Sequence, residues 1–155
     1  MAAHSDLPPF EVSEEQLSLK YQGVIHEIGP MVSEFLPHGI LIFFGEAAPE
    51  ELREVALVHN GAQLVSNLKE GDLLKFSAPS DDQQPTWYRL TAVGEKANSN
   101  LAELGHAVIH FDGAPTASLP GAISVEPSLV ALPQLGTSFE FFEVGEKYYG
   151  SGNRT

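Results

Sequence analysis

The 155-residue sequence contains no cysteine, and this absence excludes disulfides, thiolate metal sites and cysteine nucleophiles. Basic residues are scarce, because 8 lysines and arginines stand against 21 aspartates and glutamates, for a formal net charge of −13. This excess of negative charge repels nucleic acid and anionic lipid surfaces and favours a partner with a basic docking face. No apolar run approaches the roughly 20 residues that cross a bilayer, and the N-terminus does not resemble a secretory signal. These absences are compatible with a cytoplasmic protein, and any role in transport would have to be played from solution.

The remaining composition is that of a folded domain. Hydrophobic residues make up 43% of the chain and charged residues 19%, which is ordinary for a globular protein. The chain is long enough to bury one substantial core. Pro8, Pro9 and the acidic Glu14 and Glu15 lie near the N-terminus, and Gly145, Gly150 and Gly152 lie near the C-terminus. We expect a flexible extension over residues 1–18, a single domain over 19–144 and a flexible tail over 145–155.

Short apolar and alternating segments separated by turn residues predict a mainly β fold. About eight short strands and one or two short helices indicate an antiparallel closed barrel, since closure leaves no unpaired strand edge. Helical turns are expected at 49–54 and 98–104, the second ending at Gly105. The clearest predicted strands are 21–28, 40–44, 55–58, 73–76, 87–93, 107–111, 123–125 and 139–143.

The most informative block runs from Leu104 to Gly113 and reads Leu-Gly-His-Ala-Val-Ile-His-Phe-Asp-Gly. Its alternation predicts a strand between two glycine turns, with Ala107, Ile109 and Phe111 on one face and His106, Val108 and His110 on the other. Together with the upstream segments 39–45, 48–52 and 58–59, this block resembles the glucitol/sorbitol-specific IIA proteins of the bacterial phosphotransferase system. The resemblance covers most of the chain, from about residue 21 to residue 144.

The resemblance implies a phosphoryl carrier. Proteins of this family carry the phosphoryl group on a histidine, and the matching position is His59. They take the group from the phosphocarrier HPr and pass it to the IIB component of a IIB/IIC sorbitol permease, and this relay needs no cofactor. His106 also matches the family block, where it could support His59. The sequence leaves open whether the protein is a monomer or a homodimer.

The residues around His59 fit this role. A neutral imidazole nitrogen can attack phosphorus, and the transfer step needs mainly positioning, an accessible ring and hydrogen-bond donors for the phosphoryl oxygens. Asn60 and Gly61 form a turn whose backbone N–H groups could bind that anion. We expect the His59 ring to be reachable from solution, with Leu57 or Leu64 exposed nearby for docking a carrier protein. Without the resemblance, His59 would be interpreted as a polar residue closing a strand.

Three other interpretations compete with the relay. The first is a regulatory or binding module that keeps the fold but does not carry phosphate. The second is a metal site of His59, His106 and His110, which lacks the spacing typical of such sites, so no metal is expected. The third is a serine hydrolase, for which the required Gly-x-Ser-x-Gly motif is missing. Structural roles for His106 and His110 also remain open at this point.

Overall fold

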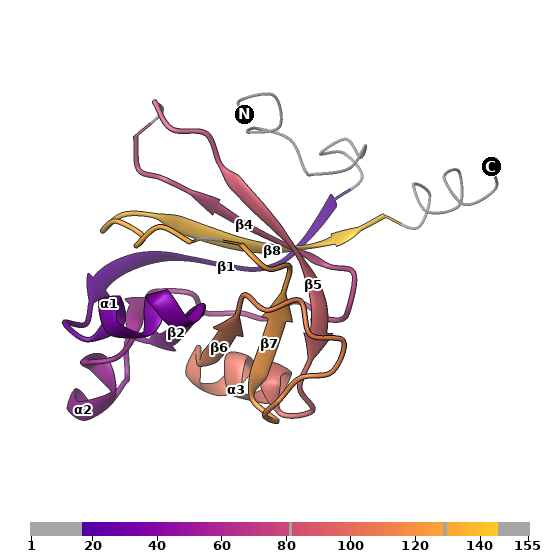
Figure 1. Ribbon diagram of the computed structural model, residues 1–155, viewed down its shortest axis with the longest axis horizontal. Helices are drawn as coiled ribbons and strands as arrows, with labels where there is room; N and C mark the ends of the chain where they lie inside the picture. Colours follow the sequence, from indigo (N-terminus) through magenta and orange to yellow (C-terminus); the bar gives the residue numbers. More distant parts are fainter. Residues whose placement is uncertain (1–16, 81, 129, 146–155) are drawn as a thin grey trace.

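Eight strands close into a barrel in the described part of the computed structural model, which comprises residues 17–80, 82–128 and 130–145 (Figure 1). Around the barrel the strands follow the order β1-β3-β2-β6-β7-β5-β4-β8. The predicted closed, mainly β architecture is therefore confirmed. The strands are β1 (Leu17–Ile28), β2 (Ile40–Gly45), β3 (Leu57–His59), β4 (Leu73–Ser77), β5 (Thr86–Val93), β6 (Ala107–His110), β7 (Ala122–Val125) and β8 (Ser138–Val144).

Most strand pairs are antiparallel, as expected, but two pairs are parallel. These pairs are β2 with β3 and β6 with β7. Parallel neighbours need a crossover connection, which residues 46–56 supply in the first case and residues 111–121 in the second. The barrel is therefore mixed, and the first parallel pair places Gly45 directly beside His59.

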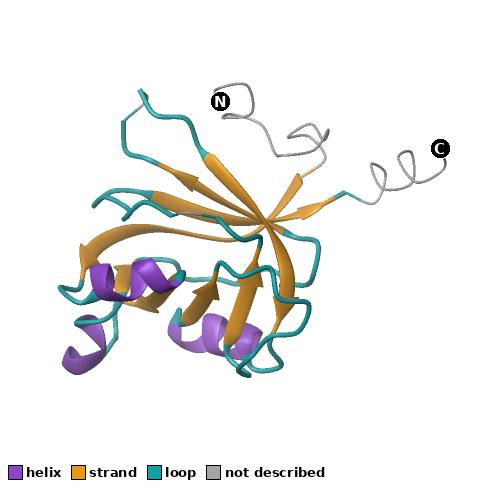
Figure 2. Cartoon of the chain, viewed as in Figure 1, coloured by secondary structure: helices purple, strands orange, loops and turns teal. Residues whose placement is uncertain are grey.

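Short helices cover one side of the barrel. They are α1 (Val32–Phe35), α2 (Glu50–Arg53) and α3 (Ala97–Leu104), and a 3₁₀ turn follows α1 at Leu36–His38. All of them lie near β2, β6 and β7, whereas β4 and β8 lie on the other side of the molecule (Figure 2). Gly105 ends α3 with a φ of 65°, a backbone conformation that glycine adopts without strain.

The long strand β1 joins the two halves of the barrel. It pairs with β8 over Leu17–Val24 and with β3 over Ile25–Ile28. The register shifts between Leu19 and Tyr21 and again between Ile25 and Glu27, and such irregularities bend a strand. The first half of β1 thus leads toward Gly23, which lies against the end of β3.

Inward-facing apolar side chains fill the barrel. Alternation along β6 buries Ala107 and Ile109 with the neighbouring Phe111, as predicted, and leaves His106 and His110 half-buried. The ring of Phe43 packs 4.7 Å from that of Phe139 across the interior. Full burial of such a side chain stabilises the fold by about 1.5–3 kcal/mol.

Several predicted boundaries differ from the structure. Leu17 and Ser18 belong to β1 and not to the expected extension; residues 1–16 and 146–155 lie outside the described residues. The strand predicted at 55–58 begins only at Leu57, because the N–H of Val55 bonds to the carbonyl of Leu52 in α2. The helix α1 and the 3₁₀ turn were not predicted. Within the described residues, no helix has the length and apolar character needed to cross a membrane.

Candidate functional site

His59 is the last residue of β3, and its side chain is completely buried, with a relative exposure of 0%. It pairs with Gly45 of β2 on one side and with Ile25 of β1 on the other. The expectation that this ring is reachable from solution is therefore wrong for this conformation. β3 lies between β1 and β2, and aromatic rings enclose the side chain of its last residue.

Two backbone groups hold the His59 ring. The N–H of Gly61 donates to Nδ1 at 2.9 Å, and Nε2 lies 2.8 Å from the carbonyl oxygen of Gly105. An N–H can only donate and a carbonyl can only accept, so Nδ1 must carry the lone pair and Nε2 the proton. Burial lowers the pKa of His59, and the hydrogen bond to Gly105 opposes that shift. The ring is thus neutral, in a single tautomer.

Aromatic rings pack around the imidazole. Phe139 meets it edge-on at 4.9 Å, and Tyr21 meets it edge-on at 6.0 Å. Phe43 completes this group with a centroid distance of 6.3 Å. The rings fix the orientation of the imidazole and keep water from it, which is why its charged form is disfavoured.

Glycines leave the space that the imidazole occupies. A Cβ atom at Gly23 would lie 3.0 Å from Nδ1 of His59, and one at Gly105 would lie 3.0 Å from its Cε1. At Gly61 a Cβ would lie 2.7 Å from both the Gln22 carbonyl oxygen and the Tyr21 ring. Larger residues at these positions would displace the histidine or the turn that covers it.

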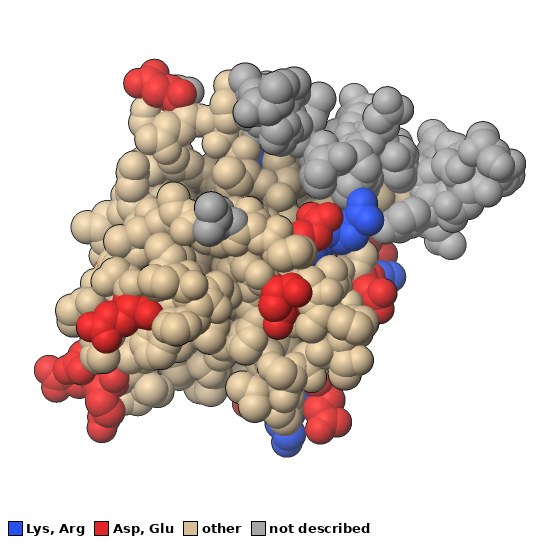
Figure 3. Space-filling view, viewed as in Figure 1, with Lys and Arg blue, Asp and Glu red and all other residues tan. Residues whose placement is uncertain are grey.

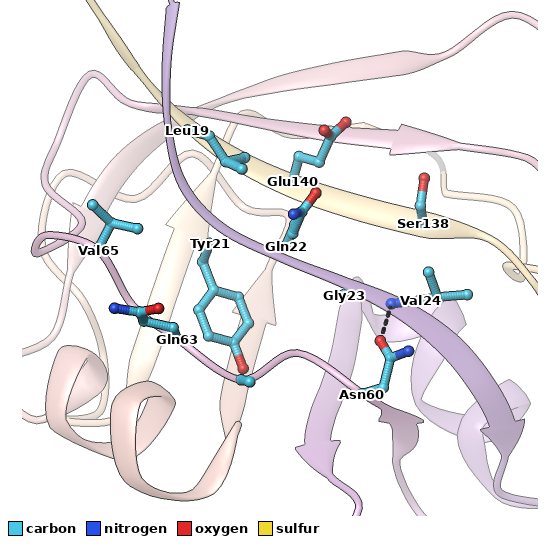
Figure 4. Close-up of a pocket in the computed structure, with 11 residues that line it drawn as sticks. Leu19, Tyr21, Gln22, Gly23, Val24, Asn60, Gln63, Val65, Ser138 and Glu140 are labelled. Carbon is cyan, nitrogen blue, oxygen red and sulfur yellow. Dashed lines mark hydrogen bonds between the residues drawn. The ribbon is translucent and has the colours of Figure 1, made fainter.

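Residues 60–62 lie over the ring. Their backbone has no regular secondary structure and forms no hydrogen-bonded turn, contrary to expectation; we call them the turn at 60–62 only because the Gly61 N–H bonds back to the His59 side chain. Asn60 and Ala62 are exposed, and Asn60 Oδ1 accepts a hydrogen bond from the N–H of Val24 at 2.9 Å (Figure 4). The Asn60 N–H bonds to the Val24 carbonyl at 3.4 Å. The N–H groups of Asn60 and Gly61, predicted to bind phosphate, are therefore both engaged in this conformation. They become available to an anion only when the turn moves.

His106 lies next to this arrangement but separately from it. Its Nδ1 is 3.2 Å from the carbonyl oxygen of Phe43, and its ring packs 4.6 Å from that of Phe44. Since a carbonyl only accepts, Nδ1 carries the proton and Nε2 the lone pair. His106 is half-buried and follows Gly105, whose carbonyl accepts the hydrogen bond from His59 Nε2. His106 itself has no hydrogen bond in common with His59. His110 lies at the other end of β6, 3.9 Å from Asp112.

Two depressions flank the turn. One has a volume of about 580 Å³ and lies along β1 and residues 60–65, and the other has about 480 Å³ and lies between α2, the end of β2 and the end of α3. Tyr21 and Ala62 line both. Burial raises the pKa of Tyr21 to about 12, so its hydroxyl stays protonated at neutral pH. Tyr21 was not predicted as a site residue, since an aromatic residue in a strand gives no signal of a site.

The histidines do not gather into a metal centre. In the ranges 17–80, 82–128 and 130–145, no three His, Asp or Glu side chains are placed to hold a metal ion. His59, His106 and His110 therefore do not form the triad considered from the sequence. The described site contains one neutral imidazole, that of His59. Its two nitrogens have fixed hydrogen-bond partners, and it lies under the turn at 60–62.

Comparison with known proteins defines the class. The family model for "PTS system glucitol/sorbitol-specific IIA component" matches residues 20–140. The chain therefore belongs to the glucitol/sorbitol-specific IIA components of the phosphoenolpyruvate-dependent phosphotransferase system, as the sequence resemblance predicted. Its role is phosphoryl relay in sugar-alcohol uptake, so the protein is a phosphotransferase component.

Individual relatives agree with this membership. The chain is 37% identical over 109 residues to the "PTS system glucitol/sorbitol-specific EIIA component" of Shigella flexneri and to that of Escherichia coli strain K12. Each match covers 70% of this chain and 83% of the relative. The crystal structure of a PTS system IIA component from Enterococcus faecalis V583 is 27% identical, with a TM-score of 0.65. That match covers 79% of this chain and 99% of the other.

Proposed function

We propose that His59 is the phosphoryl-carrying residue of this IIA component. In this proposal the cytoplasmic carrier HPr supplies the phosphoryl group, and the IIB component of a glucitol/sorbitol permease receives it. The observation that carries the proposal is the hydrogen bonding of the ring: a neutral imidazole, fixed in one tautomer, keeps a nucleophilic lone pair at Nδ1.

The chemistry requires one bond to form as another breaks. The imidazole lone pair attacks the phosphorus of the donor, and the donor's own bond to phosphorus breaks and leaves its electron pair on the donor. For attack through Nδ1, the one hydrogen bond to the ring that must break is that from the Gly61 N–H, and the proton stays on Nε2, which continues to donate to the Gly105 carbonyl. That carbonyl then stabilises the positive charge of the phosphorylated ring. Attack through Nε2 would require a tautomer change and the loss of the Gly105 contact as well.

The turn at 60–62 must open before a donor can reach Nδ1. The contacts that hold it include one hydrogen bond from Gly61 to Nδ1 and two between Asn60 and Val24. At about 0.5–1.5 kcal/mol each, the loss of these three bonds costs about 1.5–4.5 kcal/mol, which corresponds to a minor open state of the kind that loops populate. In the open state, the N–H groups of Asn60 and Gly61 would be free to bind the phosphoryl oxygens, the role that the sequence led us to expect.

His106 is the competing acceptor for the same function. Its Nδ1 is held by the Phe43 carbonyl, and no hydrogen bond from a described residue reaches the lone pair on Nε2. Its ring is half-buried, whereas that of His59 is enclosed. His106 could therefore accept a phosphoryl group without any movement of the turn.

A matched pair of variants tests the assignment. Wild type, His59→Gln and His106→Gln are incubated with enzyme I, HPr and radiolabelled phosphoenolpyruvate, and circular dichroism establishes that each is folded. We expect acid-labile, base-stable label on wild type and His106→Gln and none on His59→Gln. Mass spectrometry of labelled wild type maps the site independently of either variant.

Two results would overturn the assignment. Label that maps to His106, or that persists in His59→Gln, would transfer the role to His106. A folded wild type that takes no label would support the binding-module interpretation in place of the relay.

A further inference from the structure

The hydroxyl of Tyr21 has no hydrogen-bond partner among the described residues, although the residue is only 2% exposed. A buried tyrosine hydroxyl usually finds a partner, because an unpaired polar group in a protein interior costs free energy. The aromatic ring of Tyr21 meets the His59 ring edge-on, and this contact does not involve the need of a hydroxyl for a partner. The candidate site therefore contains one polar group whose presence the resting structure does not explain.

This hydroxyl lies against the turn at 60–62. A Cβ atom at Gly61 would lie 2.8 Å from the hydroxyl oxygen, and the Gly61 N–H is the group that donates to His59 Nδ1 at 2.9 Å. The Tyr21 side chain extends from β1 toward the chain segment that carries this turn (Figure 4). Tyr21 pairs with Phe141 of β8, so the sheet holds its backbone independently of the turn. A group that displaces Gly61 from Nδ1 would therefore come next to the Tyr21 hydroxyl.

Lysine and arginine are absent from the described residues that line the two depressions beside the turn. The charged residues among that lining are acidic, namely Glu46, Glu103 and Glu140. The nearby Arg53 of α2 pairs with Glu27. Acidic side chains also gather over α2 in the space-filling view (Figure 3). A phosphoryl group on His59 would therefore have to be stabilised by uncharged hydrogen-bond donors.

A phosphoryl group presents three terminal oxygens, each a strong hydrogen-bond acceptor. The N–H groups of Asn60 and Gly61 provide two donors once the turn has opened. We propose that the Tyr21 hydroxyl provides a third donor, and that Tyr21 is a catalytic residue that binds the phosphoryl group during its transfer to and from His59. This inference rests on the proposed function of His59.

The state of the hydroxyl suits this role. Burial raises the pKa of Tyr21 to about 12, so the hydroxyl keeps its proton and can donate it to a hydrogen bond at neutral pH. The proton stays on Tyr21 throughout, because the step requires a hydrogen bond and no proton transfer. In the unphosphorylated protein the same hydroxyl has no described partner to lose, so a phosphoryl group gains the full benefit of the contact.

Two conservative variants test the proposal. Tyr21→Phe removes the hydroxyl and keeps the ring that packs against His59. Tyr88→Phe is the matched control, because Tyr88 is also a buried core tyrosine, with 8% exposure, and lines neither depression. Circular dichroism establishes that both variants are folded.

The measured quantity is the equilibrium of phosphoryl exchange between HPr and this protein. Its constant depends on the stability of the two phosphorylated proteins and not on how tightly they dock, so it reports on the phosphoryl group itself. We expect Tyr21→Phe to shift the equilibrium roughly tenfold toward phosphorylated HPr, since a hydrogen bond to a charged group is lost, and Tyr88→Phe to match wild type.

A second measurement needs no variant in the site. Wild type labelled with ¹³C at the tyrosine Cζ positions is phosphorylated with enzyme I, HPr and phosphoenolpyruvate, and its NMR spectrum is recorded; Tyr88→Phe identifies the Tyr88 signal, and Tyr21→Phe that of Tyr21. The Tyr21 signal should shift on phosphorylation, because its hydroxyl gains an acceptor, and the Tyr88 signal should not.

The results separate this proposal from the previous one. If label maps to His59 but the exchange equilibrium of Tyr21→Phe equals that of wild type, or the Tyr21 signal does not shift, the role of Tyr21 is overturned and that of His59 stands. If wild type takes no label, or takes it on His106, the proposed function is overturned and this inference with it.

Discussion

Truncation of His59 to alanine should cost this protein several kcal/mol of stability, because the ring is part of the core. The imidazole lies among three aromatic rings. It accepts one hydrogen bond, from the Gly61 N–H, and donates one, to the Gly105 carbonyl. Its removal leaves a cavity, and comparable losses in protein cores cost about 2–5 kcal/mol. The buried Gly105 carbonyl also loses its partner, which costs about 1–3 kcal/mol. The Gly61 N–H lies on a partly exposed turn, where water can replace the ring nitrogen.

We therefore expect His59→Ala to lower the free energy of unfolding by about 3–4 kcal/mol, taking the lower part of each range because the cavity lies near the surface turn. For a domain of this size, such a loss lowers the melting temperature by roughly 10 °C. Glutamine fills more of the space and can both donate to the Gly105 carbonyl and accept from the Gly61 N–H. His59→Gln should accordingly cost only about 1 kcal/mol.

Urea unfolding followed by circular dichroism measures both variants against wild type. The dependence of the unfolding free energy on urea should stay constant, so that the midpoint reports stability directly. A His59→Ala variant within about 0.5 kcal/mol of wild type would refute the reasoning, since that is the usual range for exposed sites. If His59→Ala and His59→Gln lost the same unfolding free energy, the packing of the imidazole ring, and not its hydrogen bonds, would account for its contribution to stability.

Two further predictions concern buried ionisable groups. Burial lowers the pKa of His59 in the folded protein, so near pH 6.5 the unfolded state binds a proton at this ring that the folded state does not bind. The unfolding free energy of wild type, measured in urea, should therefore fall from pH 7.5 to pH 5.5 more steeply than that of His59→Gln. The buried pair of Lys20 and Asp72, 2.8 Å apart, supports a second test. Lys20→Met should cost about 3–5 kcal/mol by thermal unfolding, and the double variant with Asp72→Asn should regain part of that loss. An additive double variant, or parallel pH profiles, would contradict these expectations.

Local patterns in the sequence predicted much of the framework. Alternation predicted a strand at 107–111, which the structure has at Ala107–His110, and the glycine after Leu104 predicted the end of α3, because both depend on neighbouring residues alone. The helical turn at 50–53 and the strand ending at His59 were also recognisable. The parallel pairing of β2 with β3 and of β6 with β7 was not predicted, because pairing depends on contacts between distant segments.

The surroundings of the candidate site were predicted less well. Leu57 was expected to be exposed for docking but is completely buried, and Leu64 is partly buried against the core. The exposed leucines beside the site are Leu52 and Leu104 instead. A short strand gives little evidence of which face points inward, and β3, with three residues, is buried along its whole length.

The order of residues alone determined the family, the barrel and the position of His59 at the end of a strand. Only the tertiary structure decided that the ring is enclosed, which nitrogen carries the proton, and which apolar side chains surround the turn. These properties arise where β1, β2, α3 and the turn at 60–62 meet. Residues far apart in sequence meet there, so their effect on one imidazole depends on distances and hydrogen-bond directions that no local pattern encodes.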